Sequence, residues 1–225
     1  DIMLDSPTQN WATWNRQATM QSNTTLSDGM LVTKSTSSPN WMPSYLTFGP
    51  FEVGQSGKYY FEFNDDAATG YKTCNFGVTN IDRTDWSGFW WDQGDTLSWY
   101  PEAGSLYRSG SNIPTGSAGS TSGGKGMAID FGTGTITGYE YESGDVIDLT
   151  GLSSTLSLGE KYYIVAGTSN GNDTNAPFNF GQQPFRYTPP QGYTGIQSDE
   201  LPEPSIPNGR DHFRVIVGPG TGPDG

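Results

Sequence analysis

Glycine and proline interrupt this sequence so often that long helices have little room to form. The chain carries 31 glycines and 15 prolines among 225 residues, about a fifth of the total, whereas about 12% is usual. The only long stretch without either residue, 8–28, lacks the 3.6-residue spacing of apolar side chains that an amphipathic helix needs. We therefore expect a turn-rich, all-β protein.

Aromatic residues indicate that the chain nevertheless folds around a core. Hydrophobic residues make up only 32% of the sequence, a fraction that favours disorder. Tryptophan, tyrosine and phenylalanine reach 13%, however, and each of them buries a large area. Because disordered chains are poor in aromatics, we expect one large folded domain, with room at most for the edge of a second.

The charge balance excludes several classes of partner. The 24 acidic and 11 basic residues give a formal net charge of −13. Nucleic-acid phosphates and anionic membrane surfaces both require clustered lysine and arginine, so neither is an expected partner. No apolar run approaches the length of a membrane span, so no membrane insertion is expected. The sequence begins at Asp1 and shows no signal peptide, which predicts a processed product or an excised piece.

Single cysteine and histidine residues limit the metal and redox chemistry. Cys74 has no partner in the sequence for an internal disulfide or a zinc knuckle, and His212 alone cannot build a multi-histidine site. We interpret Cys74 as a small buried hydrophobe and His212 as a strand or linker residue. Asp92 and Asp95 are read as solvated turn acids rather than calcium ligands. The sequence therefore predicts no cofactor and no metal.

Short alternating segments separated by turns predict the strands. Residues 57–63 place Tyr59, Phe61 and Phe63 on one face of a strand, and Asp28-Gly29 predicts a hairpin. Further strands are expected at 75–79, 96–100, 105–108, 126–131, 135–141, 145–149, 161–168 and 176–180. Residues 109–126 read as a flexible surface loop. This pattern indicates a β-sandwich or barrel.

The order of the sequence motifs resembles that of SPRY domains. The motifs are Trp14-Asn15, LSDG at 26–29, GKYYFEF at 57–63, FGV at 76–78, SWYPEAGSLYRSG at 98–110, GMAIDFGTGTIT at 126–137 and FNFGQQPF at 178–185. The resemblance implies a concanavalin A-like jelly roll, a bent sandwich of two antiparallel sheets that binds through loops and has no catalytic centre. One departure is Gly138, where the family usually has an aromatic residue.

The flanking segments resemble those that border SPRY modules in structural proteins of bacteriophages, especially marine ones. They are DSPTQNWATWN at 5–15 and the Pro-rich segment at 187–213. The resemblance implies a virion location and four parts of the chain. These are a lead-in (1–10), the sandwich (11–188), a Pro-rich strap (189–211) and the start of a following module (212–225).

An aromatic run supplies the candidate binding site: Asp85, Trp86, Trp90, Trp91 and Asp92. Consecutive indoles on an extended segment cannot both face one core, so one of Trp90 and Trp91 should point outward or toward the mouth of the sandwich. Exposed aromatics beside carboxylates suit sugar stacking or anchoring of a protein. Packing of both indoles under neighbouring loops is the alternative interpretation.

Three functions follow from these residues. The first is recognition of a host cell-surface glycan or receptor protein by a phage tail or fibre module. The second is assembly against other virion subunits, which requires a broad apolar patch. The third is glycoside hydrolysis, which needs two carboxylates across a cleft, near Glu140 or Asp92. The fuller acid cluster of sandwich glucanases is absent from the sequence, so we expect a binding module and not an enzyme.

Overall fold

The computed structural model describes residues 10–18, 24–35, 43–55, 57–65, 71–72, 75–82, 90–100, 105–114, 123–141, 145–148, 155–167, 174–175 and 177–201. Over these residues the structure is nearly all β, and the helical elements are three 3-10 turns. They are η1 (Arg16–Ala18), η3 (Trp90–Asp92) and η5 (Ser198–Glu200). The expected all-β fold is confirmed. In this part of the chain no helix has the length and apolar character needed to cross a membrane.

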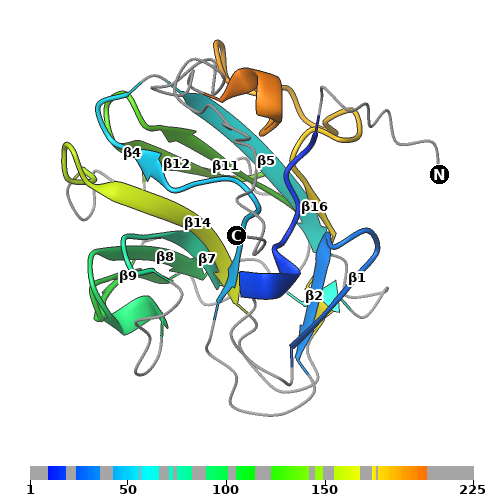
Figure 1. The fold of residues 1–225 in the computed structure, drawn as a ribbon, viewed down its shortest axis with the longest axis horizontal. Helices are drawn as coiled ribbons and strands as arrows, with labels where there is room; N and C mark the ends of the chain where they lie inside the picture. The colour runs from blue at the N-terminus through cyan, green and yellow to red at the C-terminus, as the bar shows by residue number, and fades with distance from the viewer. Residues whose placement is uncertain are drawn as a thin grey trace, which may run out of the picture.

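A seven-stranded sheet forms one layer of the sandwich (Figure 1). Its strands run in the order β10 (Ser111–Pro114), β9 (Ser105–Arg108), β8 (Thr96–Tyr100), β7 (Asn75–Thr79), β14 (Lys161–Gly167) and β3 (Ser44–Tyr45), and β4 (Phe51–Glu52) also pairs with β14. All of these pairings are antiparallel.

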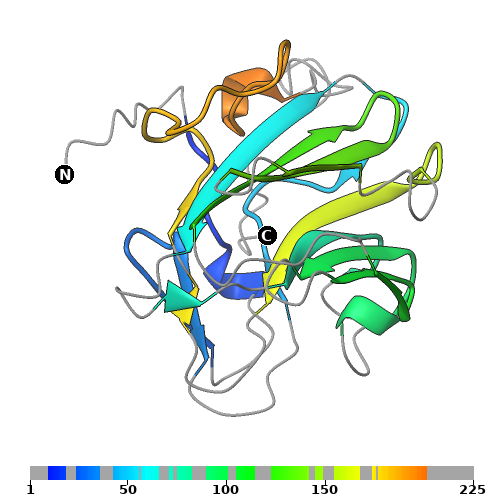
Figure 2. The ribbon, with the colours of Figure 1, turned by 180° about the vertical axis from the view of Figure 1, so that it is seen from behind.

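A five-stranded antiparallel sheet forms the facing layer, as Figures 1 and 2 show from opposite sides. Its order is β13 (Asp145–Asp148), β12 (Thr135–Glu140), β11 (Gly123–Asp130), β5 (Lys58–Asp65) and β16 (Phe178–Asn179). The longest pairing joins β11 to β5 over eight residues each. This sheet and the seven-stranded sheet together form the expected sandwich.

A third, smaller sheet was not foreseen. It contains β1 (Thr24–Ser27), β2 (Val32–Ser35), β15 (Thr174–Asn175) and β6 (Tyr71–Lys72), and the β15–β6 pairing is parallel. The predicted hairpin at Asp28-Gly29 joins β1 to β2. Both turn residues have positive φ angles, of 49° and 66°, which is the conformation that favours an Asp-Gly pair.

Aromatic side chains from both large sheets fill the space between them. The Phe63 ring on β5 meets the Phe76 ring on β7 at 4.9 Å and 90°. Trp14, from the N-terminal segment, meets the Phe178 ring at the same distance. Alternation along each strand directs these residues inward. Aromatic side chains therefore build much of the core, although only 32% of the residues are hydrophobic.

Two expected elements differ from the structure. The segment 109–126 was expected to be a loop, but residues 111–114 form β10 and residues 123–126 open β11. The strand expected at 176–180 is limited to Phe178–Asn179. Cys74, His212 and the segment 202–225 lie outside the described residues, so the interpretation of each stays a prediction, as do the four boundaries within the chain.

Residues after β16 continue along the edge of the five-stranded sheet. The Thr194 N–H donates to the Lys58 carbonyl at 3.0 Å, and the Tyr60 N–H donates to the Thr194 carbonyl at 2.7 Å. The Tyr59 hydroxyl donates to the Glu200 carbonyl at 3.0 Å. These bonds pair the free edge of β5 beyond β16.

Candidate binding face on the seven-stranded sheet

One line of residues crosses the outer side of the seven-stranded sheet. It consists of Tyr45, Val165, Gly77, Ser98 and Tyr107, which lie opposite one another on β3, β14, β7, β8 and β9. We call it the outer row. Its neighbours along each strand face the core, so alternation directs the row away from it. Gly77 and Ser98 are small, and this stretch between the aromatic ends, which we call the trough, is buried together with Tyr45 and Val165.

Trp91 lies across this trough. Its indole packs against the cluster of Tyr45 and Val165 at one end of the row. At the other end its ring centroid lies 4.8 Å from that of Tyr107, at an interplanar angle of 45°. Trp91 is only partly buried and Asp92 is exposed. The outer row therefore carries an aromatic ring that solvent, and hence a ligand, can reach.

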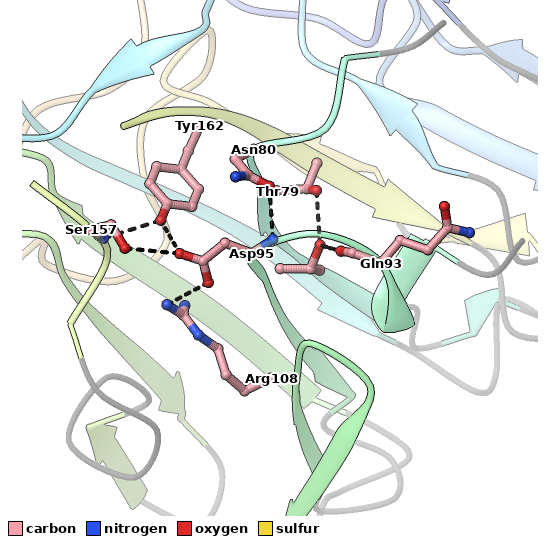
Figure 3. Close-up of polar contacts among 8 residues, drawn as sticks. Thr79, Asn80, Gln93, Asp95, Arg108, Ser157 and Tyr162 are labelled. Atoms are coloured by element: carbon pink, nitrogen blue, oxygen red, sulfur yellow. Dashed lines mark hydrogen bonds and ion pairs between the residues drawn. The ribbon is translucent and has the colours of Figure 1, made fainter. Parts of the chain in front are cut away.

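The turn that carries Trp91 is held at both ends by hydrogen bonds. The Gly110 N–H donates to the Trp91 carbonyl at 3.1 Å. The Thr96 hydroxyl donates to the Gln93 carbonyl at 2.6 Å and lies 2.8 Å from the Thr79 hydroxyl. Figure 3 shows this chain of contacts at the end of β7 and β8. These hydrogen bonds at both ends of the turn hold the Trp91 indole in position before a ligand binds.

Asp95 anchors the same turn to three other elements (Figure 3). Its carboxylate accepts hydrogen bonds from the Tyr162 hydroxyl and from Ser157 Oγ at 3.2 Å. It also forms an ion pair with Arg108 at 2.6 Å. Burial, together with the hydrogen bond to Asp95, raises the pKa of Tyr162, so this hydroxyl stays a donor at neutral pH. Asp95 is therefore an ion-paired anchor and not the solvated turn acid expected from the sequence, whereas Asp92 is exposed as expected.

A hollow of about 200 Å³ adjoins the outer row beside Tyr163. Its lining includes Asn15, Tyr45, Leu46, Pro50, Asp82 and Tyr163. The Tyr163 ring meets the Tyr45 ring edge-on at 5.3 Å, and its hydroxyl donates to the Asp82 carboxylate at 3.2 Å. Trp91 and Tyr163 both pack against the cluster of Tyr45 and Val165, and we call Trp91, Tyr163 and the hollow together the binding face.

The structure places only part of the predicted site. Trp91 lies on the binding face and Asp92 is exposed beside it. Trp90 begins η3, but its side chain lies outside the described residues, as do Asp85 and Trp86. Contact of these five residues with a ligand therefore stays a prediction.

Sequence reasoning missed Asp82 and Tyr163. The two residues are 81 positions apart, and only the pairing of β14 with β7 brings them together. The alternation of strand 161–168 marks Tyr163 as facing away from Tyr162 and Ile164, but it does not reveal which strand lies alongside. Knowledge of the strand order would have been needed to find the hollow.

Glu140 and Asp92, the acids near which a hydrolytic pair was considered, lie in different settings. Glu140 is only 3% exposed, and its strand directs it into the sandwich with Ile136 and Gly138. Asp92 lies on the outer side of the other sheet. Among the described residues, no group of three or more histidine, cysteine, aspartate and glutamate side chains could hold a metal ion.

Comparisons with known proteins found structures with a similar fold, whereas the sequence comparisons found no match. No protein-family model matches the chain, and no curated protein matches it. The crystal structure of the TRIM65 PSpry domain matches with a TM-score of 0.51 and 17% identity, over 73% of this chain and 90% of that domain. Stonustoxin matches with a TM-score of 0.50 and 17% identity, over 74% of this chain and 28% of the toxin. The chain therefore has the β-sandwich fold of a SPRY domain.

Proposed function

We propose that this protein is a non-catalytic attachment module of a bacteriophage particle. In this proposal the binding face recognises a molecule on the host cell surface, either a glycan or a receptor protein. The observation that carries the proposal is the hollow lined by Tyr45 and Tyr163, together with the partly exposed Trp91, which packs against Tyr45 and Val165. Aromatic surface next to a concave, polar-rimmed site is typical of ligand recognition.

The wider properties of the chain support attachment. The SPRY-type fold provides a rigid sandwich on which a site can be built, although fold alone does not define function. The phage context depends on the resemblance of segments 5–15 and 187–213 to those bordering SPRY modules in phage structural proteins. The net charge of −13 disfavours anionic ligands and favours neutral or cationic ones.

Assembly against other virion subunits has weaker support. That function predicts a broad apolar patch. Among the described residues, the large hydrophobic side chains that are exposed are Met30 and Leu158, at 43% and 81%. They lie in different parts of the fold, after β1 and before β14 respectively. Two isolated residues of this kind are ordinary surface features.

A binding screen with matched variants tests the proposal. Wild-type protein, Trp91→Ala and Tyr163→Ala would be compared on a glycan panel and on envelope fractions from marine bacteria. Loss of a central aromatic anchor should weaken binding by about tenfold or more. Tyr139→Ala, on the outer side of the other sheet, is the control and should bind as wild type. Wild-type binding by both face variants, with circular dichroism unchanged, would contradict the proposal.

A further inference from the structure

We propose that the hollow beside Tyr163 is a socket for a basic side chain, lysine or arginine, presented by a partner protein. In this arrangement the Asp82 carboxylate pairs with the cation, and the Tyr163 ring packs along the aliphatic stem. The inference rests on the proposed attachment function and names the occupant of its site. It selects a protein receptor over a glycan.

The size and lining of the hollow suit one long side chain. The lining combines the buried Tyr45 and Leu46 with the exposed Pro50. Tyr163 is partly exposed and offers ring surface at the side. The volume of about 200 Å³ is below the roughly 300–1,000 Å³ of sites for larger organic ligands. Lysine and arginine place apolar stems against such surfaces and keep their charge at the end.

Among the described residues, the charged side chain at the hollow is negative. Asp82 is exposed and lies at its rim. Its contact with another described residue is the hydrogen bond from the Tyr163 hydroxyl at 3.2 Å, whereas a carboxylate has about four acceptor positions. In the part of the chain that the structure describes, the lining contains no lysine or arginine. A carboxylate with spare acceptor capacity, on a chain of net charge −13, favours a cation at this position.

The chemistry of the rim also matches a donor-only group. An ammonium carries three N–H donors and a guanidinium five, and neither accepts a hydrogen bond. The Asp82 carboxylate at this rim can only accept hydrogen bonds. An aromatic ring beside the cation adds cation–π attraction. A neutral sugar would use the ring face but would leave the charge of Asp82 unmatched.

Titration of the whole protein with small probes, followed residue by residue in NMR spectra, tests this inference. The probes are Nα-acetyl-lysine methylamide, the arginine equivalent, the Nε-acetylated lysine analogue and methyl glucoside. We expect the two cationic probes to shift the signals of Asp82, Tyr163 and Leu46, and Nε-acetylation to weaken binding about tenfold. Asp82→Asn should have a similar effect, whereas Glu160→Gln, an exposed acid outside the lining, should have none.

Each other outcome overturns the inference in a recognisable way. Saturable shifts with methyl glucoside but not with the cations would assign the hollow to a glycan and leave the attachment function intact. Equal effects of Asp82→Asn and Glu160→Gln would show non-specific attraction to an acidic surface. Absence of any shift at the hollow would reject the socket, while the envelope screen decides separately on attachment.

Discussion

Gly138 on β12 shows how one residue sets the spacing between the two large sheets. A Cβ atom at this position would lie 2.8 Å from the indole of Trp99, which is fully buried on β8 in the opposite layer. The indole therefore occupies the space of a side chain. We expect Gly138→Ala to lower the free energy of unfolding by about 1–3 kcal/mol through overpacking, as measured by chemical denaturation.

A second substitution separates this steric cause from a general effect on the strand. Trp99→Phe removes the part of the indole that faces Gly138. The double variant should therefore lose about 1 kcal/mol less free energy of unfolding than the sum of the losses in the two single variants. Thr137→Ala, the neighbouring position that faces outward, is the control. Strict additivity of Gly138→Ala and Trp99→Phe would contradict the close contact.

The sequence reveals the departure at Gly138 but not its cause. Resemblance to SPRY domains marks an aromatic residue as usual there, and local alternation shows only that position 138 faces inward with Ile136. The indole that requires the glycine lies about 40 positions earlier in the chain, on the other sheet. Identification of that contact needs the packing of the two layers, which no local pattern contains.

At the scale of elements, the turn from η3 to β8 depends on Asp95. The Arg108 side chain is 13% exposed and pairs with this carboxylate, so Asp95→Asn leaves a largely buried guanidinium without its counter-charge. We expect a loss of about 2 kcal/mol in the free energy of unfolding and increased quenching of tryptophan fluorescence as the turn loosens. Asp92→Asn, which is exposed, should change stability by less than about 0.5 kcal/mol. An unchanged denaturation midpoint for Asp95→Asn would contradict the anchoring role.

The segment beside β5 protects a sheet edge. Thr194→Pro removes the N–H that donates to the Lys58 carbonyl at 3.0 Å, and we expect a cost of about 2 kcal/mol. Light scattering should also show faster aggregation, because an unpaired edge can recruit strands from other molecules. Thr188→Pro is the matched control, since its N–H has no partner among the described residues. Equal behaviour of the two proline variants would show that the edge contact is dispensable.

Element prediction succeeded where the pattern is local and failed where tertiary contacts decide. The hairpin at Asp28-Gly29 and the strand at 57–63 carry their own signals. The start of β11 carries no such signal, because Gly124 and Gly126 make this part of the sequence look like a flexible linker. A Cβ atom would lie 2.1 Å from the Tyr187 hydroxyl at Gly124 and 2.8 Å from the Tyr60 hydroxyl at Gly126. These glycines admit aromatic rings from other segments, which local sequence cannot show.

Over the whole molecule, the binding face is assembled from distant segments. Trp91 was identified because the aromatic run is visible in sequence, whereas Asp82 and Tyr163 required the order of β7 and β14. The same holds for the anchor of Trp91, since Asp95 binds Arg108, Ser157 and Tyr162 from three separate segments. The aromatic run in the sequence therefore predicted a surface with an exposed ring, and the order of the strands determined where that surface lies.

Buried tyrosines make the fold sensitive to alkaline pH. Burial raises the pKa of Tyr59 and of Tyr141 to about 12, and it also raises the pKa of Tyr60, Tyr139, Tyr162 and Tyr193. The unfolded chain releases these protons near pH 10, earlier than the folded chain does. The stability is thus fully present below pH 10 and falls as the pH rises toward 12, by on the order of 2 kcal/mol for Tyr59 alone.

We therefore expect tyrosinate absorbance to rise in two stages. The exposed tyrosines should titrate near their ordinary pKa, and the buried ones should titrate together as circular dichroism reports unfolding. Tyr59→Phe loses the hydrogen bond to the Glu200 carbonyl but cannot ionise, so its stability should start lower and decline less steeply above pH 10. A single smooth titration of all 12 tyrosines around pH 10, with the fold intact, would show that these hydroxyls are open to water and would contradict their burial between and against the sheets.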